Sequence, residues 1–163
     1  MAAEQALPFA VVILAGRAGA GDVDRVGEMV LTARGVGAHA IVVALPRGWR
    51  APAHGRVVHV APGSAPIAAV RAGMAQLSNT PARYALLWPL DAWAVSADRL
   101  RALVNEVQRE LPSLAAIDGE DVDRAPVMIA RDAWLDLMTL GEHGIEAVAA
   151  RRGMHRVVAD RAT

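Results

Sequence analysis

Uninterrupted runs of apolar residues recur along the chain, separated by segments with helical patterning. The first run occupies residues 8–15 (PFAVVILA), and later runs occupy residues 40–45 (AIVVAL) and 84–88 (YALLW). A strand with one solvated face alternates apolar and polar residues, whereas these runs are apolar throughout. They therefore predict strands that are buried on both faces, as in the parallel sheets of α/β proteins. Shorter strands are expected at residues 56–60, 114–117, 125–130 and 155–159.

The segments between these runs carry the signals of helices. Helices are expected at residues 23–34, 65–77, 97–110, 132–140 and 144–151. The third is the most clearly amphipathic, with Leu100, Leu103 and Val107 on one face. Asp22 and Ser64 stand where N-capping side chains are expected. This alternation predicts a single α/β domain over residues 1–163, with a mostly parallel sheet covered by helices on both faces.

The composition excludes several kinds of site. The chain has no cysteine, which excludes disulfides, thiolate metal sites and a cysteine nucleophile. Its 17 basic residues, all arginine, balance 17 acidic residues, so the charge gives no support for a nucleic-acid or membrane partner. The apolar run at residues 9–15 is too short to span a bilayer, and no basic segment of a signal peptide precedes it. We therefore expect a cytoplasmic protein.

A glycine-rich turn, residues 14–21 (LAGRAGAG), follows the first predicted strand. Such a turn lets backbone N–H groups approach a phosphate at the start of the next helix. The turn lacks the Gly-Lys-Ser/Thr of a Walker motif, and the spacing of its glycines differs from G-x-G-x-x-G. From the residues alone, a phosphate-binding loop and a purely structural tight turn are both open interpretations.

Asp91 follows the fourth predicted strand. In a parallel α/β sheet, ligands bind at the carboxyl ends of the strands, so Asp91 and the glycine turn are expected at the same edge. A carboxylate is a ligand that Mg²⁺ prefers, although an aspartate at this position also suits a turn or a helix cap. Both interpretations of Asp91 stay open at this point.

Four segments, in order along nearly the whole chain, resemble the MobA-like nucleotidyltransferases of molybdenum-cofactor synthesis. They are LAG at residues 14–16, VRAGM at 70–74, LLWPLDAWAVS at 86–96, and the series DG, APVM, RDAW and LGEHG between 118 and 144. The resemblance implies a three-layer α/β/α fold, GT-A-like and Rossmann-like, with one antiparallel strand near the end. It also implies transfer of a nucleotide from an NTP to a phosphorylated acceptor such as molybdopterin, with Mg²⁺ as cofactor.

The same resemblance assigns roles to particular residues. Asp91 and Glu142 would be the metal ligands, Glu142 replacing the family's late aspartate. The residues assigned to nucleotide binding are Leu14, Ala15, Gly16, Gly19, Arg71 and Gly73.

The cations of the family's first motif are absent from this chain. The family's arginine falls on Gly21 and its lysine on Val26, which leaves Arg17 and Arg25 as the replacement catalytic cations. Losing two charge-assisted bonds to phosphate weakens binding by roughly 10²- to 10⁴-fold unless these arginines compensate. Two hypotheses follow. The chain is a nucleotidyltransferase, or it is a catalytically degenerate relative (a pseudoenzyme) that binds a partner such as a metalloenzyme during maturation.

Other polar and aromatic residues carry weaker signals. His143, inside the turn at residues 141–144, is a candidate ligand contact, and the remaining histidines lack metal-ligand spacing. The acidic loop at residues 118–123 is expected to be solvated, and Trp93 is expected either to pack at a rim or to stack on a base. A third hypothesis is a plain doubly wound domain, which would show no antiparallel strand near the end.

Overall fold

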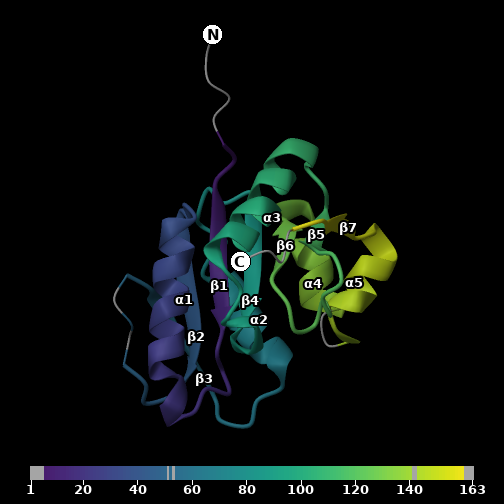
Figure 1. Cartoon of the computed structure of the whole chain (residues 1–163). Coiled ribbons are helices and arrows are strands. Elements are labelled where there is room, and N and C mark those ends of the chain that lie inside the picture. Colours follow the sequence, from purple (N-terminus) through teal and green to yellow (C-terminus); the bar gives the residue numbers. More distant parts are fainter. Residues whose placement is uncertain (1–5, 51, 53, 141–142, 160–163) are drawn as a thin grey trace.

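The computed structural model describes residues 6–50, 52, 54–140 and 143–159. Within these residues seven strands form one sheet, in the order β3-β2-β1-β4-β6-β5-β7 (Figure 1). The strands are β1 (Phe9–Leu14), β2 (Ala40–Pro46), β3 (Arg56–Val60), β4 (Tyr84–Pro89), β5 (Leu114–Ile117), β6 (Val127–Ala130) and β7 (His155–Val157). β6 runs antiparallel to β4 and β5, and the other pairs are parallel. This confirms the mostly parallel sheet with one antiparallel strand and excludes the plain doubly wound alternative.

Helices cover both faces of the sheet and complete the predicted three layers. α1 (Val23–Gly35) and α3 (Ala97–Glu110) pack on one face, and α2 (Pro66–Ala75), α4 (Trp134–Leu140) and α5 (Ile145–Arg152) pack on the other. Alternate residues of β1 point to opposite layers, so that Val11 and Ile13 contact the first core and Ala10 and Val12 the second. None of the described helices is long and apolar enough to cross a membrane.

Neither predicted N-cap side chain bonds to the first turn of its α-helix, because each has another hydrogen-bond partner. α2 has Ala65 at its N-cap position and begins at Pro66, whereas the Ser64 hydroxyl donates to the carbonyl of Ala61 at 2.6 Å. Asp22 does occupy the N-cap position of α1, but it makes no capping bond there. Its carboxylate instead accepts the backbone N–H of Gly19 at 2.8 Å. Short polar side chains readily form such local alternatives to capping.

α2 lies unusually close to β1 at Gly73. A Cβ atom placed on Gly73 would be 2.4 Å from Cγ1 of Val12, and Val12 is completely buried. A buried β-branched side chain has little freedom to move aside. The glycine therefore permits the close packing of this helix on the central strand.

The α4–α5 pair is held by a nearly buried carboxylate. Asp136 is 8% exposed, and its Oδ2 accepts a hydrogen bond from Nε of Arg152 at 2.6 Å. Nε of Arg151 lies 3.7 Å from the same oxygen. The hydrogen bond from Arg152, aided by the charges of both arginines, lowers the pKa of Asp136 and outweighs the opposing effect of burial. The ionised carboxylate is therefore the form that stabilises the fold.

We expect Gly73→Ala to destabilise the chain by about 1–3 kcal/mol relative to Gly27→Ala, because only the first creates an overpacked contact. Gly27 in α1 is the matched control, since a Cβ there meets nothing within 4 Å. Gly27→Ala itself is expected to stabilise by about 0.5–1 kcal/mol through helix propensity. Urea unfolding of both variants measures the difference, and equal stabilisation by both would contradict the packing role.

We expect Asp136→Asn to lower Tm at neutral pH and to lose that effect in acid. Because folding lowers the pKa of Asp136 below its ordinary value of 3.8, its contribution is present above that pH and disappears as the pH falls through the lower, folded-state value. The Tm of the variant should therefore be below that of wild type at pH 7, and the two Tm values should become equal as the pH falls into the acid range. Asp98→Asn is the control, since that side chain is 92% exposed. If the difference in Tm between wild type and Asp136→Asn is the same at every pH, Asp136 does not act through its charge.

Candidate functional site

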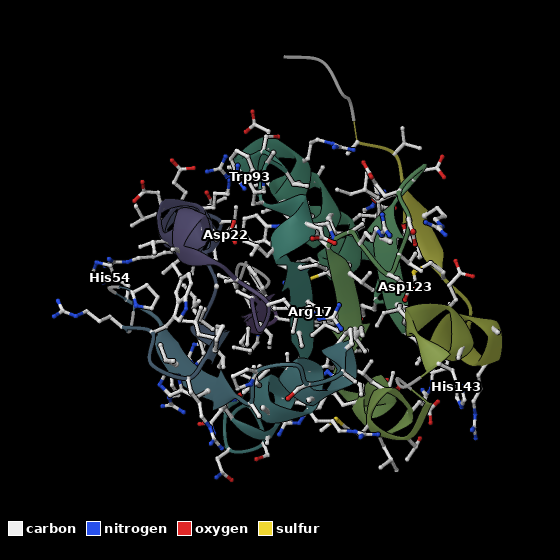
Figure 2. All side chains as sticks on the ribbon, turned by 90° about the horizontal axis from the view of Figure 1, so that it is seen from below. Arg17, Asp22, His54, Trp93, Asp123 and His143 are labelled. Atoms are coloured by element: carbon white, nitrogen blue, oxygen red, sulfur yellow. The ribbon has the colours of Figure 1, made fainter. Side chains whose placement is uncertain are left out.

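The register between β1 and β4 brings the glycine turn and Asp91 to the same edge of the sheet. Leu14 is paired with Pro89, so Gly16 and Asp91 each lie two residues beyond the end of the paired segment. Both residues line one cleft of about 1170 Å³ at the carboxyl ends of the two strands. Figure 2 views the molecule from this edge, with Arg17 near the centre and Trp93 and Asp123 to either side.

Gly16 is required where the turn leaves β1. A Cβ on this residue would come within 2.9 Å of Cγ2 of Val60. The turn is braced by bonds from Ala15 N–H to the Ala44 carbonyl and from Ala18 N–H to the Ala15 carbonyl, each 3.0 Å. No described residue accepts a hydrogen bond from the backbone N–H groups of Gly16 and Arg17. Both residues line the cleft, so these two N–H groups have no described partner in a segment that borders it.

The two arginines near the turn differ in what they contact. Arg17 is exposed, lines the cleft and has no ion pair or side-chain hydrogen bond to any residue in the described part of the chain. Arg25 also lines the cleft, but its guanidinium lies 3.3 Å from the Asp22 carboxylate and 4.7 Å from the centre of the Trp93 ring. Trp93 therefore supports a cation on one face at the rim. Of the two predicted cations, Arg17 is the one whose guanidinium is not already held by protein groups.

Asp22 occupies a position that an anionic ligand would favour. One carboxylate oxygen accepts the Gly19 N–H, and the other faces Arg25. A phosphate in this part of the turn would have to compete with a fixed negative charge for both donors. Within the turn, Gly19 is thus occupied by Asp22, whereas Gly16 and Arg17 have no such partner among the described residues.

Asp91 lies in a short 3₁₀ turn, η2 (Leu90–Ala92), directly after β4. The turn is anchored by a buried hydrogen bond from Trp88 Nε1 to the Ala92 carbonyl at 2.8 Å. The Asp91 carboxylate is exposed on the cleft and bonds to no described residue. The described residues contain no group of three or more side chains that would hold a metal ion by themselves. Mg²⁺ commonly takes one or two carboxylates together with substrate phosphates, and Asp91 fits that arrangement.

Several residues that the resemblance assigns to the site lie outside the lining of the cleft. Arg71 donates two hydrogen bonds to the Met138 carbonyl, at 3.1 and 3.3 Å, and so links α2 to α4. Gly73 faces β1, Ala15 is buried, and Gly19 carries the bond to Asp22. Their roles in nucleotide binding stay predictions, as does that of Leu14, which does line the cleft.

The predicted turn at residues 141–144 is described only at His143 and Gly144, and Gly144 lines the cleft. Glu142 lies outside the described residues, so its predicted metal role is untested. His143 is exposed and does not line the cleft; in Figure 2 it lies at the periphery.

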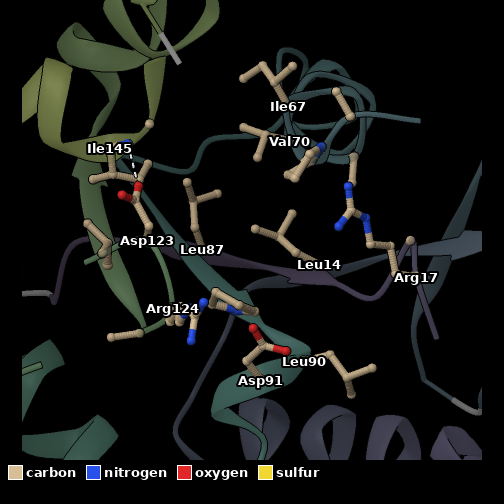
Figure 3. A pocket seen from close by; sticks show the side chains of 18 of the residues that line it. Leu14, Arg17, Ile67, Val70, Leu87, Leu90, Asp91, Asp123, Arg124 and Ile145 are labelled. Atoms are coloured by element: carbon tan, nitrogen blue, oxygen red, sulfur yellow. Dashed lines mark hydrogen bonds between the residues drawn. The ribbon is translucent and has the colours of Figure 1, made fainter. Parts of the chain in front are cut away.

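Two residues of the cleft, Asp123 and Arg124, were missed by sequence reasoning. The Asp123 carboxylate accepts the Ile145 N–H at 2.8 Å and so caps α5 (Figure 3). Arg124 is exposed in the cleft, and its guanidinium bonds to no described residue. Both precede β6, whose reversed direction brings its start, rather than its end, to the edge where β1 and β4 end. The predicted antiparallel strand was the signal that would have placed them.

Comparison with known proteins finds the fold but no sequence family. No family model matches the chain, and no curated protein matches its sequence. Among solved structures, Rv0371c from Mycobacterium tuberculosis H37Rv is similar with a TM-score of 0.75 and 19% identity, over 96% of this chain and 90% of that one. A second structure of Rv0371c, a complex with manganese, gives a TM-score of 0.73 and 21% identity, over 97% and 91% of the two chains.

Enzymes that transfer nucleotides are also among the similar structures. The 2-C-methyl-D-erythritol 4-phosphate cytidylyltransferase from Thermus thermophilus has a TM-score of 0.68 at 16% identity, over 95% of this chain and 90% of that one. A nucleotidyl transferase from Methanothermobacter, Mth528, has a TM-score of 0.64 at 17% identity, over 96% and 89%. The chain therefore has a nucleotidyltransferase-like α/β fold.

Proposed function

We propose that the cleft binds a nucleoside triphosphate with a divalent cation and transfers the nucleotide to a phosphorylated small-molecule acceptor. The observation that carries this proposal is the presence of Arg17 and Asp91 in one cleft, neither of them bonded to a described residue. A guanidinium with two adjacent N–H groups suits a phosphate, and a carboxylate suits a hard cation. The similarity to nucleotidyltransferases in fold supports the same assignment.

The chemistry depends on positioning and on neutralising charge. An oxygen of the acceptor phosphate would attack the α-phosphorus of the nucleotide, and the bond to the β-phosphate would break to release pyrophosphate. Arg17 would hold the leaving phosphates, and Asp91 would hold the cation. The cation, when bound, supplies positive charge to the phosphate oxygens. Magnesium is the cation implied by the resemblance, and manganese, present in one Rv0371c structure, is the second candidate.

The acceptor is open between two classes. Molybdopterin is suggested by the resemblance to MobA-like proteins, and a polyol phosphate is suggested by the substrate of the Thermus thermophilus enzyme. Calorimetry with GTP and CTP, each with Mg²⁺ or Mn²⁺, followed by a pyrophosphate-release assay with each acceptor, tests the proposal. Absence of nucleotide binding at millimolar concentrations would overturn it.

The alternative proposal is a degenerate relative that serves as a binding or maturation accessory protein, and one observation motivates it. Asp22 already occupies the Gly19 N–H and faces Arg25, so half of the turn is closed to phosphate. Under this alternative the chain would bind a partner metalloenzyme and no nucleotide. The same titration separates the two proposals, because tight binding of the cation–nucleotide complex with pyrophosphate release contradicts the alternative.

We expect Arg17→Ala to weaken binding of the cation–nucleotide complex by about 10- to 100-fold, because one charge-assisted contact with phosphate is lost. Arg34→Ala is the matched control, since Arg34 is an exposed arginine of α1 outside the cleft. Calorimetric Kd values measure both. If the two variants bind equally well, Arg17 is not the phosphate contact.

We expect Asp91→Asn to remove most of the dependence of nucleotide affinity on the divalent cation, because the amide keeps the shape but loses the charge that binds the cation. The readout is the ratio of Kd with EDTA to Kd with Mg²⁺, compared with that of wild type and of Asp98→Asn. A ratio unchanged from wild type would remove Asp91 from the metal role.

A further inference from the structure

Uncharged side chains that recognise hydroxyl or ring-nitrogen groups are scarce in the walls of the cleft, and of its six described charged residues Asp22, Asp123 and Arg25 already bond to protein groups. Ser64 is the single hydroxyl side chain among its described lining residues, which include no Thr, Tyr, Asn, Gln or His. The Ser64 hydroxyl is already used, since it donates to the Ala61 carbonyl. A polyol or a pterin moved into this cleft would give up bonds to water with few side chains to replace them.

The apolar side chains of the cleft come together from four elements. In Figure 3, Leu14 and Leu87 from the adjacent central strands, Ile67 and Val70 from α2, and Ile145 from α5 project toward the pocket. Ile145 and Ile67 are half-buried, so they retain surface that a ligand would cover. Covering aliphatic surface with an apolar group is favourable in proportion to the area removed from water.

One cation stands at the same end of the cleft as Ile145. Arg124 lines the same cleft as Asp91, and its guanidinium bonds to no described residue. The neighbouring carboxylate of Asp123 is turned to the Ile145 N–H. Arg124 is therefore placed to hold a phosphate in the same cleft as the carboxylate that would bind the cation, where an attacking phosphate oxygen is needed.

We infer that the acceptor is a phosphate monoester with an apolar body that carries few hydroxyl groups, bound through Arg124 at the phosphate and Ile67 and Ile145 at the body. This inference rests on the proposed function, since it takes the cleft to be the site of an acceptor. An acceptor of this kind differs from a polyol phosphate. Arg124 would bind this acceptor, whereas Arg17 would bind the nucleotide.

The test is calorimetric titration of the whole chain, without nucleotide, with phenyl phosphate, glycerol 3-phosphate and inorganic phosphate. Phenyl phosphate should bind about tenfold or more tightly than either of the others, because only its body covers the aliphatic wall. Arg124→Ala should weaken binding of phenyl phosphate by about 10- to 100-fold, and Arg34→Ala should leave it unchanged. An unchanged far-ultraviolet circular dichroism spectrum of Arg124→Ala shows that the variant is folded.

Several outcomes would overturn the inference. Equal or tighter binding of glycerol 3-phosphate or inorganic phosphate contradicts the apolar body, and an Arg124→Ala variant with wild-type affinity contradicts the phosphate contact. No binding of phenyl phosphate at millimolar concentrations contradicts both. The experiment distinguishes failure of this inference from failure of the proposed function. If the chain binds phenyl phosphate but no nucleotide, only the proposed nucleotidyl transfer is contradicted.

Discussion

The parallel pairing of β1 with β4 is the constraint on which the rest of the structure depends. Six consecutive residues of each strand are in register, from Phe9 with Tyr84 to Leu14 with Pro89. Both strands are covered on both faces, so a slip of one residue would exchange the side chains that face the two cores. The same register sets the turn after β1 opposite the turn after β4. The placement of Gly16, Arg17 and Asp91 thus follows from core packing rather than from contacts among these residues.

Most of the fold was predictable because its signals are local and repeated. Apolar runs marked the buried strands, and amphipathic periodicity marked α3, where Leu100, Leu103 and Val107 are all buried. The incorrect predictions of capping hydrogen bonds concern short polar side chains that have two possible hydrogen-bond partners nearby. Ser64 bonds to Ala61 and Asp22 bonds to Gly19. Residue type and spacing do not decide between such alternatives, because each is worth about the same free energy.

Residues of the candidate site could be predicted only where they follow the carboxyl end of a predicted parallel strand. Gly16, Arg17 and Asp91 were found because they follow strands of the same direction. Arg124 precedes a strand, and it reaches the cleft because β6 is reversed beside β4. Gly73 and Arg71 show the opposite case, since each has a structural contact that accounts for its residue type without a ligand. Tertiary contacts therefore show which motif residues already have a structural role, whereas their roles in binding stay predictions.

Charge in the cleft explains why nucleotide binding would have to depend on a cation. Three arginines and three aspartates are among the described lining residues, so together they offer no net positive charge to a triphosphate. One of these arginines is paired with Asp22, and the Gly19 N–H is taken by the same carboxylate. Arg17 alone cannot neutralise three phosphates, and Asp91 would repel them unless a metal ion lay between. If the cleft binds a nucleotide as proposed, the cation that accompanies it would have to supply the positive charge that the basic residues missing from the turn do not.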